Sequence, residues 1–221
     1  MATWITHLRI AENILNKGYD LDTKAFTVGN IGPDSGVPNK DWSSFNPSKS
    51  VTHWLDTSNK IDAKAFYDKY ANDATLRQDK DTYSFILGYY VHLLTDIEWS
   101  KLTDVKKLNP LYKEGFGKDS KFIWTIKKDW YGLDFLYLET NPKSLFFTTF
   151  KDILEVPDYL DYYPQGAFTT QVKYITDYYL NENEETKEDF IYLNKGEMDD
   201  FVLTATQTII TTLENVIEPA L

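Results

Sequence analysis

The sequence predicts an all-α fold: a single-domain, multi-helix bundle of about six to eight helices spanning residues 1–221. The stretch Tyr83–Ile97, YSFILGYYVHLLTDI, is apolar or aromatic on nearly every face and contains no proline. A helix that is apolar all round belongs at the centre of a bundle. Apolar residues recur at helical spacing in several other segments, and no convincing set of alternating strands is present. A chain of 221 residues is large enough for one well-filled core.

The composition excludes several classes of protein. Apolar residues make up 42% of the chain and aromatic residues 16%, so the chain is not disordered. The formal charge of −11 argues against a nucleic-acid partner, whose binding needs a basic face. The absence of cysteine excludes disulfides and thiolate metal sites. No signal-peptide pattern and no membrane-spanning run of about 20 apolar residues is found, so we expect a cytoplasmic protein without stable membrane insertion.

The amino-terminal half predicts two helices before the central one. Thr3–Asn16 carries an apolar stripe and is followed by a glycine, which predicts a helix. Gly18–Lys49 is rich in Gly, Pro, Asp, Asn and Ser and is expected to form a shaped loop. A second helix is expected to start at Asn59 or Asp62, and the central helix to cover about Thr82–Ser100.

The carboxyl-terminal half is expected to add further helices to the bundle. A charged stretch is expected to run to about Lys118, and the acidic run NENEETKED to form a solvated turn. An aromatic loop is expected over 156–166. Helices are expected over about 120–138, 167–180 and 196–217. Another is expected to start at Asn141-Pro142, with Asn141 as its cap and Pro142 as its first residue.

Two ionisable side chains interrupt the apolar central stretch. His92 and Asp96 are spaced i, i+4, which places them on one face of the helix. A buried carboxylate is costly unless it is paired or binds a cation. The two side chains could therefore form a core hydrogen-bonded pair or hold a metal ion.

Three further residues extend this pair into a candidate metal site. His7 lies at the edge of the first apolar stripe, His53 lies in the apolar run SVTHWL, and Asp34 projects from the loop GNIGPDSG. Each of the three could equally serve packing or capping. Together with His92 and Asp96, they offer nitrogen and oxygen donors suited to Zn²⁺ or a similar ion.

At these positions the sequence resembles the zinc-dependent phospholipase C family, which shares its fold with single-strand-specific nucleases. The matching pieces are Trp4-x-x-His7, GNIGPD with Asp34, Thr52-His53 and Gly88-Tyr-x-x-His92-x-x-x-Asp96. They occupy roughly the first hundred residues.

The resemblance implies an all-α fold and a ligand assignment. It implies that Asp34, His53, His92 and Asp96 surround one zinc, and that Asp96 bridges to a second zinc also held by His7. In secreted members the chain begins at the tryptophan and a further zinc uses downstream histidines. Here three residues precede the tryptophan and no histidine follows His92, so we expect about one or two ions. Carboxylates such as Glu98, Asp129 or Asp134 are candidates to complete a reduced site.

The resulting hypothesis is metal-dependent hydrolysis of a phosphodiester or phosphomonoester by a metal-activated water. Asp34 is expected to be a ligand first and a general base second. Two alternatives remain open: a triple-histidine thiol-dependent transferase, and a non-catalytic helical protein that keeps a structural metal. The expected partner is a small phosphorylated substrate or a phospholipid. The sequence does not identify the substrate, the metal or the oligomeric state.

Overall fold

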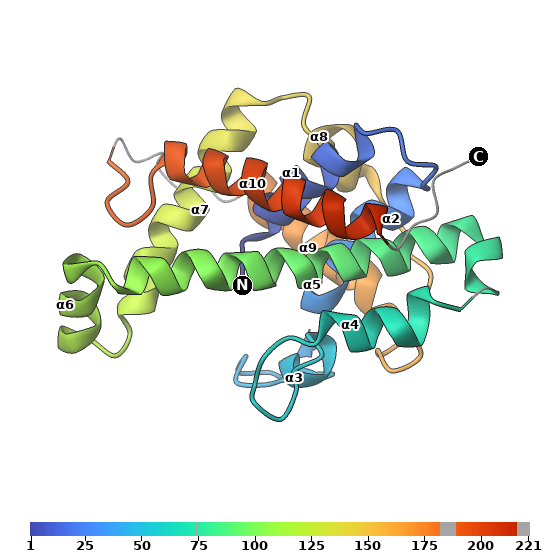
Figure 1. The fold of residues 1–221 in the computed structure, drawn as a ribbon, viewed down its shortest axis with the longest axis horizontal. Helices are drawn as coiled ribbons and strands as arrows, with labels where there is room; N and C mark the ends of the chain where they lie inside the picture. Colours follow the sequence, from blue (N-terminus) through green and yellow to red (C-terminus); the bar gives the residue numbers. More distant parts are fainter. Residues whose placement is uncertain (74, 182–188, 216–221) are drawn as a thin grey trace.

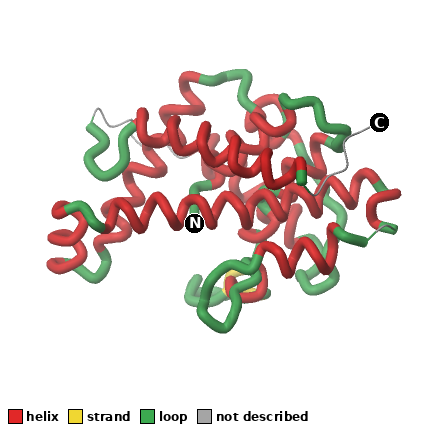
Figure 2. Tube along the Cα trace, in the orientation of Figure 1, coloured by secondary structure: helices red, strands yellow, loops and turns green. Residues whose placement is uncertain are grey.

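A long central helix organises the molecule. The computed structural model describes residues 1–73, 75–181 and 189–215. Helix α5 (Lys80–Lys107) runs along the longest axis, and the other helices gather around it (Figure 1). Every residue of α5 from Ser84 to Leu93 is buried, as the apolar sequence predicts. The all-α prediction is confirmed, because the described chain is almost entirely helix and loop (Figure 2).

The remaining elements are mostly short. The only sheet among the described residues pairs two-residue strands, with Val37 opposite Asn46. The other α-helices and the strands have these bounds: α1 Trp4–Leu15, α2 Thr23–Gly29, α3 Lys49–Thr52, α4 Ala63–Phe66, α6 Pro110–Lys118, α7 Phe122–Thr140, α8 Leu145–Thr148, α9 Ala167–Asn181, α10 Lys195–Glu214, β1 Val37–Pro38 and β2 Phe45–Asn46.

Helix α2 approaches the central helix more closely than a pair of ordinary side chains would permit. Gly29 and Gly88 face each other at the crossing. A Cβ atom on Gly88 would lie 2.2 Å from the Phe26 carbonyl oxygen, and one on Gly29 would lie 2.1 Å from the Phe85 carbonyl oxygen. The crossing therefore requires glycine on both helices, and it holds the loop after α2 against α5.

Helices α1 and α10 cover another side of the core. Arg9 donates to Asp199 across this pair at 2.6 Å, and Asn13 donates to Thr206 at 3.3 Å. Below them, Trp99 of α5 packs edge-on against an aromatic ring from α7 and one from α10, with centroids about 5 Å apart. These contacts tie the carboxyl-terminal helices to the helices that carry the candidate site.

Several predicted boundaries were wrong. The segment 18–49 is not all loop: it contains α2, capped by Asp22, and a 3₁₀ turn at Gly32–Asp34. The charged stretch before Lys118 is helical as well, because α5 continues to Lys107 and α6 follows directly.

The Asn141-Pro142 signal does not start a helix. Asn141 caps the end of α7, and Ser144 precedes α8. The helices predicted over about 167–180 and 196–217 are present as α9 and α10, although residues 216–217 lie outside the described part of the chain. Most of the acidic NENEETKED run lies outside the described residues.

Candidate metal centre

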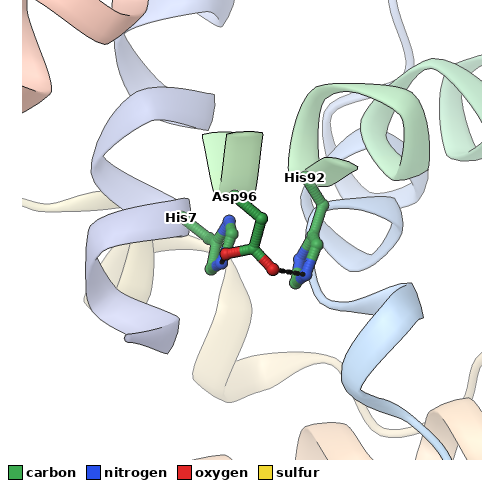
Figure 3. Close-up of side chains that lie close together, drawn as sticks. All are labelled: His7, His92 and Asp96. Carbon is green, nitrogen blue, oxygen red and sulfur yellow. Dashed lines mark ion pairs between the residues drawn. The ribbon is translucent and has the colours of Figure 1, made fainter. Parts of the chain in front are cut away.

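The five predicted site residues converge from four separate elements. His7 lies on α1, Asp34 ends the 3₁₀ turn and His53 is the residue after α3, while His92 and Asp96 both lie on α5. Figure 3 shows the Asp96 carboxylate beside the imidazoles of His7 and His92, which are stacked with their centroids 3.8 Å apart. The tertiary fold thus brings together residues separated by up to 89 positions (96 − 7).

The two Asp96 oxygens face different histidines. Oδ1 lies 3.5 Å from His7 Nε2, while Oδ2 lies 3.6 Å from both His53 Nε2 and His92 Nε2. His53 Nε2 is also 3.4 Å from Asp34 Oδ1. The donors form two groups that share His92: one with His7 and Asp96, and one with Asp34 and His53.

These separations fit shared coordination better than direct hydrogen bonding. Hydrogen bonds between nitrogen and oxygen measure about 2.7–3.2 Å. Two ligands about 2.0–2.1 Å from one tetrahedral zinc lie about 3.4 Å apart. The distances of 3.4–3.6 Å match the second value.

The facing atoms are buried and unsatisfied. His7 Nδ1 and Nε2, His53 Nε2, His92 Nε2 and Asp96 Oδ2 have no hydrogen-bond partner among the described residues. An unpaired buried polar group costs about 1–3 kcal/mol, so several in one place require compensation. A cation bound between His53 Nε2, His92 Nε2 and Asp96 Oδ2 would satisfy three of these atoms at once, and the residues present therefore fit a metal ion.

In His53 and His92, the ring nitrogen Nδ1 lies within hydrogen-bonding distance of a neighbouring oxygen. His92 Nδ1 donates to the Asn30 carbonyl at 2.7 Å. His53 Nδ1 lies 3.0 Å from Thr52 Oγ1. A carbonyl oxygen can only accept, so Nδ1 of His92 carries the proton and its Nε2 presents a lone pair to the site, as metal-ligating histidines require.

Trp4 and Ala2 orient the two carboxylates. Trp4 Nε1 donates to Asp34 Oδ2 at 3.0 Å, and the Ala2 backbone amide donates to Asp96 Oδ1 at 2.8 Å. The sequence did not predict these contacts or those of Asn30 and Thr52. The available signal was position in the chain, since Thr52 directly precedes a candidate ligand and Asn30 closes the helix before the Asp34 turn.

Burial and mutual charge set the protonation of the site. Burial, together with the His92 ring stacked on it at 3.8 Å, lowers the pKa of His7 to about 4. Burial also lowers the pKa of His92, but Asp96 and Asp34 outweigh it and the net pKa is raised. Burial raises the pKa of Asp34, yet His53 and His92 hold it well below its usual range. Near neutral pH the site thus combines an ionised Asp34 with a neutral His7.

Thr52→Val tests the hydrogen bond that orients His53. Valine keeps the shape of threonine but removes the oxygen that lies 3.0 Å from His53 Nδ1. Loss of such an outer contact typically lowers metal affinity by about 10–100-fold, and we expect a change of that size. Competition for zinc with a chelating dye measures it. An unchanged affinity would show that the hydroxyl does not position the ring.

The three carboxylates considered for a reduced site lie in neither donor group. Glu98 pairs with Lys101 at 2.6 Å, and Asp129 accepts the Tyr192 amide at 2.6 Å. Asp134 accepts from Thr3 at 2.7 Å and from Tyr179 at 2.6 Å. Each of them is occupied by a contact elsewhere in the structure.

Asp134 predicts a pH-dependent contribution to stability. Burial raises its pKa to about 7, against the hydrogen bonds from Tyr179 and Thr3 and the nearby charge of Arg9. The folded chain therefore keeps this proton up to about pH 7, while the unfolded chain loses it near pH 4. The group's contribution to stability is full below about pH 4 and is lost as the pH rises through 7, by about 4 kcal/mol at most.

Asp134→Asn removes this titration. We expect the unfolding free energy of the variant, relative to wild type, to rise by a few kcal/mol between pH 4 and pH 8. Urea unfolding at a series of pH values measures the difference. Parallel pH profiles for the two proteins would contradict the assignment.

Comparison with known proteins agrees with the site. Residues 6–99 match the family model described as zinc dependent phospholipase C. This range contains all five converging residues. No curated protein and no solved structure matches the chain. The resemblance to the zinc-dependent phospholipase C family is therefore confirmed over residues 6–99.

Proposed function

We propose that the protein is a zinc-dependent phosphoester hydrolase. His7, Asp34, His53, His92 and Asp96 would hold the metal. The observation that carries the proposal is the set of facing donor atoms, unsatisfied and 3.4–3.6 Å apart, within the family-matched region. When bound, zinc would lower the pKa of a water ligand to near neutrality and would polarise a phosphoryl oxygen of the substrate.

The arrangement of donors supports one or two ions. Asp34, His53 and His92, with Oδ2 of Asp96, offer four donors for a first ion. A second position would rely on His7 and Oδ1 of Asp96, which also accepts the Ala2 amide at 2.8 Å. With fewer free donors, this second position should bind more weakly.

Asp34 is suited to a part in the proton transfer. Its side chain is 11% exposed, whereas the other four site residues are 2% exposed or less. Hydrolysis joins a water oxygen to phosphorus, breaks the bond to the leaving oxygen and releases a proton. Asp34, anchored by Trp4 at the edge of the site, is the carboxylate placed to accept that proton.

The region that acts as one unit is proposed to be the whole chain. Helices α7, α9 and α10 pack against the helices that carry the site, as the contacts of Trp99, Arg9 and Trp4 illustrate. Among the described residues no helix is both long and apolar enough to cross a membrane. The proposed substrate is a small phosphorylated molecule or a phospholipid.

The test is a panel of phosphoesters assayed with zinc-loaded protein. Nitrophenyl phosphate, bis-nitrophenyl phosphate and a short-chain phosphatidylcholine cover the monoester, diester and lipid classes. We expect turnover of at least one, abolished by a chelator and lowered about 100-fold or more by Asp34→Asn. Asp200→Asn, an exposed acid on α10, is the matched control and should keep full activity. Zinc-loaded protein without activity on any of the three would overturn the proposal.

A further inference from the structure

A large cleft opens directly onto the candidate metal centre. It has a volume of about 780 Å³ and reaches His53 and Asp96 at one side. One wall is the face of α5 that carries Ile97, and the other is the segment 49–61. The cleft is therefore the route by which a substrate would meet the donor atoms.

Lysines border this cleft in a chain whose net charge is −11. Lys49, Lys60 and Lys107 all line it. Lys107 is paired with Asp104 at 3.0 Å, but neither Lys49 nor Lys60 forms an ion pair with any carboxylate in the described part of the chain. Asp56 lies near Lys60 yet accepts its backbone amide, at 2.9 Å, rather than its ammonium group. Two positive charges are thus left available at the cleft.

Lys49 also borders the carboxylate side of the centre. It lines a small hollow of about 90 Å³ together with Asp34 and His53. The pKa of Lys127 on α7 is lowered, mainly by burial and also by the nearby positive charge of Lys49. Positive charge is therefore concentrated at the rim of a site whose own ligands include two carboxylates.

A neighbouring pocket is lined by aromatic rings, whose faces attract cations rather than anions. It measures about 460 Å³ and is lined by Trp54, Tyr70 and Tyr162, with none of the five donor residues in its wall. The Lys69 ammonium already lies 5.5 Å from the Trp54 ring and 4.9 Å from the Tyr70 ring. A cationic headgroup in this pocket would have to displace Lys69 from these rings.

We propose that the cleft selects a phosphoester that carries a negative charge in addition to its reacting phosphate, and that Lys49 and Lys60 bind this second anionic group. The wall of the cleft contains no Phe, Tyr or Trp ring, so it lacks the surface that recognises a quaternary ammonium. This inference rests on the proposed function for the identity of the ester. Its test measures binding and needs no turnover.

Two phosphonates that cannot be hydrolysed separate the alternatives. Carboxyethyl phosphonate and trimethylammonioethyl phosphonate share the phosphonate and differ in the charge of the far end. Isothermal titration of zinc-loaded protein should show the carboxylate compound binding about tenfold more tightly or better. Lys49→Gln and Lys60→Gln should each weaken its binding about fivefold, the effect of one close charge in water, and the double variant should bring the two affinities close together. Lys101→Gln removes a charge from α5 outside the cleft and should change neither affinity.

The possible results are distinct. Tighter binding of the trimethylammonium compound, or a preference that survives in the double variant, would overturn the inference and favour the aromatic pocket. If the preference depends on both lysines, the inference holds even when no phosphoester is hydrolysed, in which case only the proposed reaction falls.

Discussion

Asp96→Asn is expected to release zinc and to lower phosphoester hydrolysis by more than about 100-fold. Both oxygens of this carboxylate face imidazole nitrogens, at 3.5 Å and 3.6 Å. Asparagine removes the negative charge and replaces one oxygen with an amide nitrogen, which cannot bind a cation. Replacing an outer contact typically costs 10–100-fold, so loss of a shared inner ligand should exceed that range. Metal content and initial rates, measured on the same preparation, test the expectation.

Asp129→Asn is the matched control. Asp129 is also a buried acid, but it accepts a backbone amide, and asparagine retains an acceptor for that bond. The control should keep both zinc and activity. A triple-histidine transferase would instead keep its metal in Asp96→Asn, because its ligands are histidines alone. Retention of zinc by Asp96→Asn would therefore favour that alternative.

Gly88→Ala is expected to destabilise the protein by about 3 kcal/mol or more. The added methyl carbon would lie 2.2 Å from the Phe26 carbonyl oxygen and 3.0 Å from the Gly29 Cα, and both are backbone atoms that cannot rotate away. Overpacking of a core usually costs about 1–3 kcal/mol, and a backbone obstruction belongs at the upper end or beyond. Urea unfolding measures the change.

Gly117→Ala provides the control for helix propensity. Gly117 lies in α6, and a methyl group there would meet no atom within 4 Å. Its replacement should leave stability unchanged or raise it by up to about 1 kcal/mol. If Gly88→Ala also left the stability unchanged, that result would contradict the close crossing of α2 and α5. Separation of these helices would also displace Asn30 and the turn that carries Asp34.

Much of the fold could be predicted because the central segment has an unambiguous pattern. The run from Ser84 to Leu93 is apolar on all faces, and it is buried on all faces. The prediction failed where short helices depend on contacts that a local pattern does not contain. Helix α2 has only seven residues and ends at glycine, and its place is set by the Gly29–Gly88 crossing. Helix α6 starts at Pro110, shortly after α5 ends, within the charged stretch for which no helix was predicted.

The candidate site was predictable in its residue types but not in its supporting contacts. The i, i+4 spacing of His92 and Asp96 follows from helix geometry alone. The position of Asp34 relative to His53 depends on how the turn after α2 meets the segment before α4, which no local spacing specifies. The contact from Trp4 to Asp34 and the large cleft lined by Lys60 are tertiary features of the same kind.

The zinc content of wild type beside His92→Ala tests whether the converging donors hold a metal. His92 belongs to both donor groups, and without it a second ion would have only His7 and Asp96, so its removal should eliminate every ion, whereas His7→Ala should remove at most one. We expect one to two equivalents of zinc in purified, metal-equilibrated wild type and none in His92→Ala, by elemental mass spectrometry. Wild-type protein without zinc, or equal zinc in the two proteins, would contradict it and leave His92 and Asp96 as a buried pair.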